Sequence, residues 1–192
     1  HPEHCVGLVR EHHADVGITL DGDADRLILV DELGNIVDGD AVMVMLAIDL
    51  KARGMLKKNT LVTTVMSNLG LHQVLHARGI DTIQTKVGDR YVVEAMRAEG
   101  YSLGGEQSGH IVMLDHATTG DGLLAALRVL SLMRRSGQKL SELASVFHKL
   151  PQVLINFRVD RKIPLEELAM SSRRIAEVSE AYGDAGRVLV RY

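Results

Sequence analysis

The sequence contains no tryptophan, only 3% aromatic residues and a single cysteine. Few aromatic rings and a net charge of -3 leave neither a base-stacking platform nor a basic surface, so nucleic acid is excluded as an expected partner. The one cysteine, Cys5, excludes an internal disulfide framework and fits a reducing cytoplasm. The longest apolar run, residues 41–48, is too short to cross a bilayer. We therefore expect a cytoplasmic protein with no membrane partner.

Apolar runs and amphipathic stretches alternate along the first 150 residues, in a chain with 46% hydrophobic and 24% charged residues, a mixture typical of globular proteins. The pattern predicts strands at residues 16–20, 27–30, 61–65, 82–87, 101–103 and 111–114. It predicts helices at residues 2–13, 38–53, 67–78, 90–99, 122–135 and 141–149. Repeated strand-then-helix units indicate an α/β fold, with a layered domain around a mostly parallel or mixed sheet.

Beyond Pro151 the pattern changes to a strand at 153–159, a helix at 165–182 and a strand at 187–192. The chain begins with His-Pro-Glu-His rather than methionine and stops within the last apolar run. We therefore expect this sequence to be a piece of a longer protein.

Residues 21–26, called the aspartate loop below, read Asp-Gly-Asp-Ala-Asp-Arg and separate the first two predicted strands. Asp21, Asp23 and Asp25 repel one another unless a cation offsets their charges. The small residues between them let the backbone curl so that the oxygens converge, and hard oxygen ligands favour magnesium or calcium over zinc. The alternative is a solvated turn, in which Asp and Gly are common. We favour the metal site.

An EF-hand calcium loop shares part of this pattern, because Glu32 stands at the twelfth position counted from Asp21. The sixth position of that loop requires glycine, whereas this chain has Arg26, and both flanks are predicted strands rather than helices. We therefore reject calcium sensing and predict Mg²⁺, held with open coordination positions. Arg26 offers a fork for phosphate oxygens, with a plain surface charge as the alternative.

Residues 104–110, called the glycine-framed loop below, read Gly-Gly-Glu-Gln-Ser-Gly-His and lie between two later strands. The glycines permit close approach of a ligand to the backbone. Glu106, Ser108 and His110 supply donors and acceptors suited to sugar hydroxyls. Taken alone, polar residues between glycines usually form only a connecting loop.

Together the two loops resemble the α-D-phosphohexomutase superfamily in their order and spacing. Three further segments, residues 66–70, 86–91 and 118–122, are similar to the bacterial phosphoglucosamine mutase branch. Phosphomannomutase and phosphoglucomutase relatives tend to have His in place of Asp89 and Met in place of Gln107. This chain departs from the family at Ala24, where glycine is usual; the small side chain should leave the three carboxylates in place.

The resemblance implies a four-domain protein of which this chain holds the middle. Residues 1–36 would end the second domain and carry the metal loop, residues 37–152 would form the third domain with the sugar-binding loop, and residues 153–192 would begin the fourth. The family's catalytic serine, phosphorylated in a Ser-His-Asn loop, would lie upstream, since no such loop occurs here. The fragment by itself should therefore be inactive.

The resemblance also implies a reaction: interconversion of glucosamine 6-phosphate and glucosamine 1-phosphate by an isomerase, through a phosphoserine and a bisphosphorylated sugar, for UDP-N-acetylglucosamine and cell-wall precursors. The cofactor would be Mg²⁺ on the three aspartates. The substrate would be a hexosamine phosphate, and a homodimer of the full-length protein is compatible with the family. The implied substrate-binding residues are Arg26, Lys86, Asp89, Glu106, Ser108 and His110. Of these, His110 is also a candidate proton shuttle, because histidine side chains ordinarily titrate near neutrality.

Several alternatives remain open at this point. Asp89 and Asp121 can equally be read as N-caps of the helices that follow them, and His110 as a cap for a strand. A phosphoglucomutase or phosphomannomutase is the rival within the enzyme class. A non-catalytic module that binds metal or sugar phosphate is the rival outside it.

Overall fold

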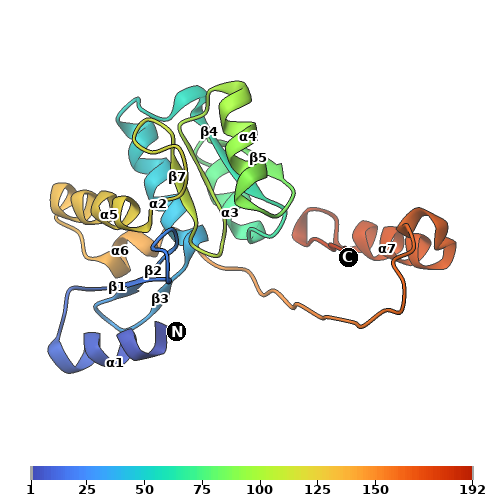
Figure 1. Ribbon diagram of the computed structural model, residues 1–192, viewed down its shortest axis with the longest axis horizontal. Helices are drawn as coiled ribbons and strands as arrows, with labels where there is room; N and C mark the ends of the chain where they lie inside the picture. The colour runs from blue at the N-terminus through green and yellow to red at the C-terminus, as the bar shows by residue number, and fades with distance from the viewer. Residues whose placement is uncertain (1, 192) are drawn as a thin grey trace. The chain divides into compact units, whose positions relative to one another are not determined.

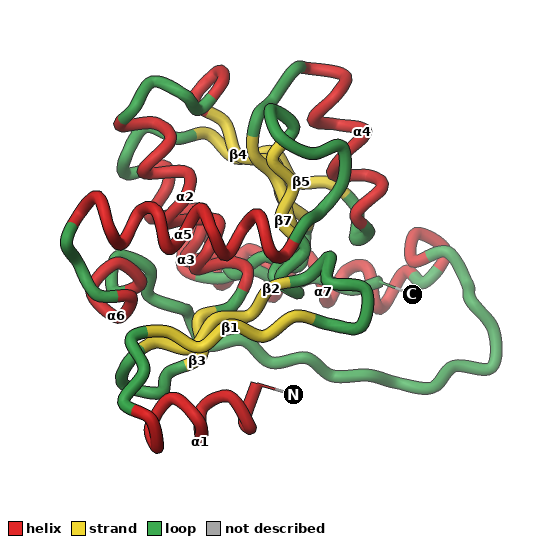
Figure 2. The backbone as a smooth tube through the Cα atoms, turned by 60° about the vertical axis from the view of Figure 1, so that its left-hand side comes forward, coloured by secondary structure: helices red, strands yellow, loops and turns green. Residues whose placement is uncertain are grey.

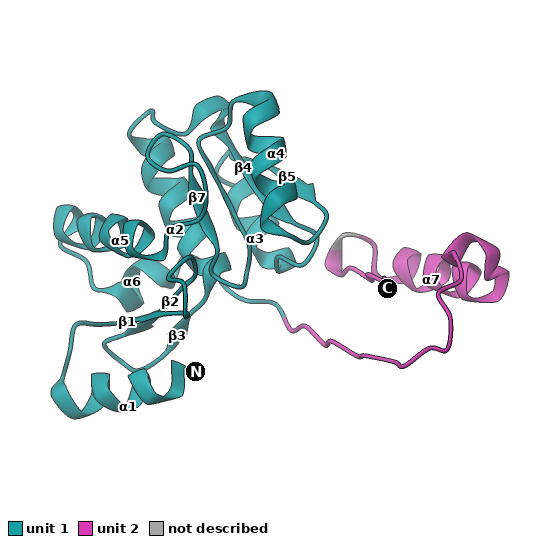
Figure 3. Ribbon diagram, viewed as in Figure 1, with its two compact units in different colours: residues 1–150 teal, residues 151–192 magenta. Residues whose placement is uncertain are grey.

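The computed structural model describes residues 2–191, and this part of the chain divides after Leu150 into two compact units (Figure 3). The first unit holds every strand among the described residues, and the second contains one long helix (Figure 1). Within residues 2–191, no helix combines the length and the apolar character that crossing a membrane requires.

The first unit begins with a helix packed on a small antiparallel sheet (Figure 2). Helix α1 (Pro2–His12) precedes strands β1 (Val16–Leu20), β2 (Leu27–Asp31) and β3 (Ile36–Val37), which lie in that order across the sheet. The helix approaches closely at Gly17, where a β-carbon would collide with side chains of α1. Strand β3 has no signal in the sequence, because two residues are too few to show alternation.

A second, four-stranded sheet forms the centre of the unit, with the strand order β5-β4-β6-β7. Its strands are β4 (Thr60–Thr64), β5 (Asp81–Thr85), β6 (Leu103–Gly105) and β7 (Ile111–Met113). Strand β4 pairs in parallel with β5 and β6, while β7 is antiparallel to β6. The sheet is therefore mixed, as the predicted α/β fold requires.

Helices cover both faces of this sheet. They are α2 (Gly39–Ala52), α3 (Leu69–His76), α4 (Asp89–Glu99), α5 (Gly122–Ser136) and α6 (Leu140–Ala144), with a 3₁₀ turn at Lys57–Asn59. Consecutive residues of β4 enter different apolar clusters: Leu61 joins the cluster that contains α2, α3 and α5, and Val62 joins the cluster that contains α4. Such alternation is what a strand buried on both faces produces.

The predicted helices are present with two differences. The expected helix at 141–149 is the short α6, which ends at Ala144 although Phe147 remains buried. Helix α4 begins at Asp89, with Gly88 as its N-cap at φ +128°. The reading of Asp89 as an N-cap is therefore wrong, and its carboxylate is not used in capping. Asp121 does cap α5, since it accepts a hydrogen bond from the Leu124 N–H at 2.8 Å.

The second unit contains a 3₁₀ turn at Leu165–Glu167, helix α7 (Ala169–Tyr182) and a 3₁₀ turn at Gly183–Ala185. The strands expected at 153–159 and 187–192 are absent from residues 153–159 and 187–191; residue 192 lies outside the described residues. A strand requires a hydrogen-bonded neighbour, and neither apolar run pairs with one. Val153 and Phe157 are accordingly each 82% exposed.

Candidate active site

The aspartate loop is the turn of the β1–β2 hairpin. The two strands pair in register from Val16 with Asp31 to Leu20 with Leu27, so residues 21–26 must reverse the chain. The Ala24 N–H donates to the Asp21 carbonyl at 3.2 Å, and Ala24 adopts φ +60°, a left-handed conformation. Both flanks are strands, which confirms that an EF-hand, with its flanking helices, is excluded.

The turn gathers the three carboxylates. Asp21, Asp23 and Asp25 each offer one oxygen, and these atoms lie within 4.8 Å of one another. One oxygen of Asp25, Oδ1, is buried and has no hydrogen-bond partner among the described residues. A buried acceptor without a donor is costly, and a bound cation would satisfy it. The donor set therefore fits a hard divalent cation such as Mg²⁺.

The pKa values of Asp21 and Asp25 reflect the crowding of the aspartate loop. Burial, followed by the hydrogen bond with Asp21 and repulsion from Asp21 and Asp23, raises the pKa of Asp25. Burial also raises the pKa of Asp21, but a backbone hydrogen bond from Arg26 and the side-chain bond with Asp25 outweigh it, so the net shift is downward. Like charges at this spacing oppose simultaneous ionisation unless positive charge is added.

Arg26 forms an ion pair with the aspartate loop. Its Nε lies 3.8 Å from Asp21 Oδ2, and the Arg26 side chain is 53% exposed. The guanidinium is therefore accessible to a phosphate as well as paired with the loop. An exposed ion pair of this kind adds little stability by itself.

The glycine-framed loop is the turn between β6 and β7, and it lies against the aspartate loop. It is closed internally by hydrogen bonds from Glu106 N–H to the His110 carbonyl and from Gly109 N–H to the Glu106 carbonyl, both 3.0 Å. The Leu27 N–H donates to the Gly109 carbonyl at 3.0 Å, at the start of β2. Gly109 has φ +97°, and a β-carbon there would collide with the Leu27 backbone. Glycine is thus needed for the two loops to touch.

His110 joins the two loops chemically. It is 2% exposed, and its Nε2 lies 3.4 Å from Asp25 Oδ2 and 3.9 Å from Asp89 Oδ2. Neither ring nitrogen has a hydrogen-bond partner among the described residues. The ring packs on Gly120, where a β-carbon would collide with it. The ring of His110 therefore caps no strand in the described part of the chain, and its imidazole faces two carboxylates instead.

Glu106 connects the segment between β5 and α4 to the glycine-framed loop. Its Oε1 accepts a hydrogen bond from the Gly88 N–H at 2.9 Å, and Glu106 is 9% exposed. This contact holds the start of α4, and with it Asp89, beside the glycine-framed loop. Ser108 and Lys86 are exposed, and both lie on segments joined by this contact.

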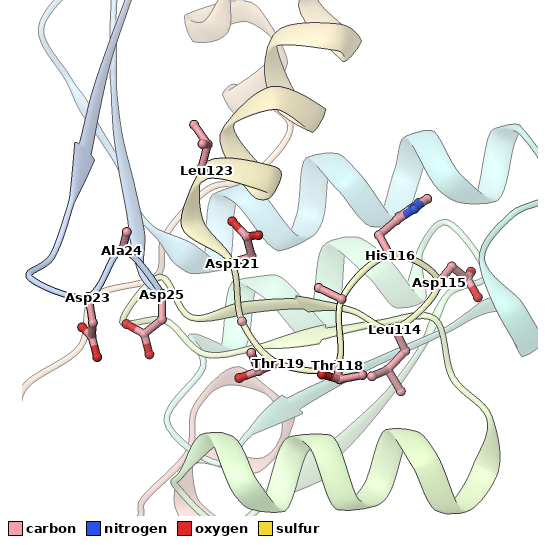
Figure 4. A pocket seen from close by; sticks show the side chains of 12 residues that line it. Asp23, Ala24, Asp25, Leu114, Asp115, His116, Thr118, Thr119, Asp121 and Leu123 are labelled. Carbon is pink, nitrogen blue, oxygen red and sulfur yellow. The ribbon is translucent and has the colours of Figure 1, made fainter.

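A cavity of about 830 Å³ opens beside the aspartate loop (Figure 4). It is bordered on one side by Asp23 and Asp25 and on the other by residues 114–121, between β7 and α5. Thr118 and Thr119 belong to this wall, and reasoning from the sequence gave them no role. The signal available in the sequence is their place in the segment 118–122, whose two glycines pack closely against residues of the site. Gly122, for example, donates its N–H to the Ala24 carbonyl at 2.9 Å.

The comparison with protein families is decisive for the class of protein. A family model described as phosphoglucomutase/phosphomannomutase, alpha/beta/alpha domain III, matches residues 38–150. The chain belongs to the phosphoglucomutase/phosphomannomutase family. The matched range contains the glycine-framed loop and the 114–121 wall of the cavity, and the aspartate loop precedes it.

Curated relatives of this family member are named phosphoglucosamine mutase. The protein from Anaeromyxobacter dehalogenans is 56% identical over 191 residues, and that from Nitratidesulfovibrio vulgaris is 54% identical over 192 residues. Both matches cover 100% of this chain but only 42% and 43% of the relatives, so the chain spans less than half of their length.

The fold recurs in a solved structure of Aspergillus fumigatus N-acetylphosphoglucosamine mutase in complex with GlcNAc-6P and magnesium. The match has a TM-score of 0.57 at 20% identity and covers 70% of this chain and 33% of that one. At this identity the similarity concerns the architecture.

Proposed function

We propose that the full-length protein is a phosphoglucosamine mutase, an isomerase that interconverts glucosamine 6-phosphate and glucosamine 1-phosphate. One structural observation carries the proposal: Asp25 of the aspartate loop and His110 of the glycine-framed loop lie 3.4 Å apart. Groups suited to a metal and groups suited to a sugar thus share one site. The names of the relatives at 54% and 56% identity support the choice of an amino sugar.

The domain assignment belongs to the same proposal. Residues 1–36 end a second domain, residues 37–152 form a third, and residues 153–192 begin a fourth. The match of the domain III model to residues 38–150 supports the central boundaries. The phosphorylated serine that the reaction needs would come from a part of the protein other than these 192 residues, in which no Ser-His-Asn sequence occurs.

Asp21, Asp23 and Asp25 would hold Mg²⁺ through one oxygen each. Bound there, Mg²⁺ would neutralise charge on the transferring phosphoryl group. Arg26, which is accessible beside Asp21, would bind free oxygens of the same phosphate. Phosphoryl transfer depends mainly on such positioning and charge neutralisation.

In the forward step a sugar hydroxyl oxygen forms a bond to phosphorus while the seryl oxygen–phosphorus bond breaks, which gives a bisphosphorylated sugar. The hydroxyl proton must leave, and Nε2 of His110 would accept it; the proposal is supported by the absence of another hydrogen-bond partner for this nitrogen among the described residues. The carboxylates of Asp25 and Asp89, at 3.4 and 3.9 Å, would stabilise the imidazolium formed. In the second step the seryl oxygen forms a bond to the other phosphorus while the bond from that phosphorus to the sugar oxygen breaks, and the imidazolium returns its proton to this sugar oxygen.

The remaining predicted residues would bind the sugar. Glu106 and Ser108 would hold hydroxyls in both orientations of the substrate. Lys86 would contact it from the segment between β5 and α4, and Asp89 from the start of α4. A hexosamine phosphate is the proposed partner, within a cytoplasmic route to UDP-N-acetylglucosamine, and a homodimer is proposed for the full-length protein. Lone Cys5 supports the reducing compartment.

The test is a coupled assay of the full-length protein with Mg²⁺ and the 1-phosphates of glucosamine, glucose and mannose. We expect the highest kcat/KM with glucosamine 1-phosphate. Faster turnover of glucose or mannose phosphate would assign the protein to a phosphoglucomutase or phosphomannomutase instead. Binding of sugar phosphate without turnover of any of the three would identify a non-catalytic module.

A further inference from the structure

Asp40 is a buried carboxylate that no step of the proposed reaction uses. It is the second residue of α2 and is 0% exposed. Its Oδ2 accepts hydrogen bonds from the Asn68 backbone N–H at 2.8 Å and from Nε2 of Gln107 at 3.0 Å. A carboxylate is rarely buried unless it is paired, and here the two hydrogen bonds supply the pairing.

The bond to Gln107 connects Asp40 with the glycine-framed loop. A backbone hydrogen bond joins the same two segments, since the Gly39 N–H at the start of α2 donates to the Gln107 carbonyl at 3.2 Å. A β-carbon on Gly39 would collide with the carbonyl oxygen of Glu106 and with the Gly109 nitrogen. The loop is thus seated on the first turn of α2 by both its main chain and one side chain.

Gln107 therefore points into the protein, between two residues with proposed roles toward the sugar. Glu106 is fixed through its bond to Gly88 N–H, and Ser108 is exposed. With Glu106 and Gln107 both anchored, the backbone that leads into Ser108 is held in place. Loss of either anchor would leave the loop with fewer restraints and a larger set of conformations.

The second bond of Asp40 extends this arrangement to the end of the first unit. Asn68, the N-cap of α3, donates its backbone N–H to Asp40, and its side chain exchanges two hydrogen bonds of 2.9 Å with the backbone of Leu150. Asp40 thereby lies where the glycine-framed loop, the start of α3 and the last residue of the unit meet. This gives it a fixed position from which to hold Gln107.

We propose that Asp40 is a positioning residue, which holds Gln107 and so fixes the glycine-framed loop in the shape that presents Glu106 and Ser108 to a sugar phosphate. The assignment rests on the proposed function for the identity of the ligand. The hold on the loop itself does not depend on that identity, so the two can be tested separately.

The experiment uses the full-length protein with Gln107→Leu, Asp40→Ala, Asp40→Asn and the Asp40→Ala/Gln107→Leu double variant. Two readouts are taken: calorimetric binding of glucosamine 6-phosphate, and amide hydrogen exchange at Glu106 and Gly109 without ligand. The control is Asp31→Asn, which alters another buried carboxylate, bonded to Leu33, Asn35 and the β2–β3 turn rather than to the loop.

Gln107→Leu and Asp40→Ala should each weaken binding about tenfold and speed exchange at both amides, since either removes the same anchor. Asp40→Asn should stay within about twofold of wild type, because its amide oxygen can accept the same two hydrogen bonds. The double variant should be no worse than either single variant, as expected for residues that act through one bond. The control should leave loop exchange unchanged.

Unchanged exchange and binding in Gln107→Leu would overturn the proposal, and that variant decides the matter even if Asp40→Ala does not fold. Additive losses in the double variant would also overturn it, because Gln107 would then contact the ligand directly. If wild type neither binds nor turns over glucosamine phosphates, the proposed function fails. Faster exchange in Gln107→Leu and Asp40→Ala would still support Asp40 as the anchor of the loop.

Discussion

Nε2 of the buried His110 lies 3.4 Å from Oδ2 of Asp25, so one imidazole connects the glycine-framed loop with the aspartate loop. The two residues are far apart in the sequence and lie in the hairpin turns of two different sheets. Their contact depends on the hydrogen bond between Leu27 N–H and the Gly109 carbonyl, which joins the two hairpin turns. The chemistry proposed for the site requires that this contact survive in solution.

Asp23→Asn should remove activity from the full-length protein with little effect on the fold. Asp23 is exposed, so its loss leaves no buried group unpaired, but the proposed Mg²⁺ site loses one of its three anionic ligands. We expect kcat to fall by at least about 100-fold and Mg²⁺ affinity to fall in parallel. Steady-state kinetics measures kcat, and a titration with Mn²⁺, used as a probe in place of Mg²⁺, measures the affinity of the metal site.

Asp15→Asn is the matched control, because Asp15 is an exposed aspartate at the start of the same hairpin. It should leave kcat, Mn²⁺ binding and thermal unfolding near wild type. Equal turnover by Asp23→Asn and wild type would refute the metal role of the aspartate loop.

The central fold could be predicted because its signals are local. Strand β4 is rich in β-branched residues, and helix α2 contains the longest apolar run. Asp38, Asn68 and Asp121 are N-cap residues that the structure uses as caps. Carboxylates at alternate positions likewise predict that the oxygens of the aspartate loop converge. Each of these signals lies within a few neighbouring residues, where intrinsic propensity acts.

What could not be predicted depends on partners distant in the sequence. The apolar runs at 153–159 and 187–191 have strand-like composition but no strand beside them. The Asp40–Gln107 bond links residues 67 positions apart, and no periodicity reveals it. The role of Gly88 as a cap was missed because Asp89, a better capping type, stands next to it; the positive φ at Gly88 decides the matter.

Gly120→Ala should disturb the site by moving His110. A β-carbon at Gly120 would collide with the imidazole, so the ring must shift from its place beside Asp25. We expect the full-length variant to lose about 10- to 100-fold in kcat, because small displacements of a reacting group are costly. In this chain the overpacking should also lower the free energy of unfolding by about 1–3 kcal/mol.

Gly7→Ala is the control for what a glycine-to-alanine change does by itself, without a collision with His110. Gly7 lies within α1, and a β-carbon there meets nothing within 4 Å. Helix propensity predicts that this variant is more stable by about 0.5–1 kcal/mol, with unchanged turnover. If Gly120→Ala behaves like Gly7→Ala, the packing of His110 on Gly120 is not what places the ring.

Ala24→Gly should relieve strain in the aspartate loop. Ala24 has φ +60°, and a left-handed conformation costs a residue with a β-carbon about 1–2 kcal/mol. Glycine avoids this cost but gains freedom in the unfolded chain, so the expected net stabilisation is about 0.5 kcal/mol. Urea unfolding of this chain measures it. Ala24→Val, whose branched side chain tolerates φ > 0 less well, should be destabilised, and the opposite order would show that the turn is unstrained.

Asp40 should make the stability of this chain fall as the pH rises toward neutrality. Burial is the main cause that raises the pKa of Asp40 from 3.8 to about 6, and repulsion from Asp38 adds to it. Hydrogen bonds from Asn68 and Ser67, and the charge of Lys149, oppose the shift without cancelling it.

The folded state therefore binds this proton more tightly than the unfolded state. Between the two pKa values the folded chain carries more protons, so its stability decreases as the pH rises through that window and levels off above about 6. The shift corresponds to about 3 kcal/mol, because each pKa unit is worth about 1.4 kcal/mol.

Asp40→Asn cannot titrate and keeps an oxygen for the bonds from Asn68 and Gln107. Urea unfolding of both proteins from pH 4 to pH 8 isolates the effect, since other groups titrate alike in both and cancel in the difference. We expect the variant to gain on wild type through this window and then to keep a constant advantage. A difference that stays flat from pH 4 to pH 8 would mean that the Asp40 carboxylate keeps its charge when buried, and that its hydrogen bonds offset the full cost of removing it from water.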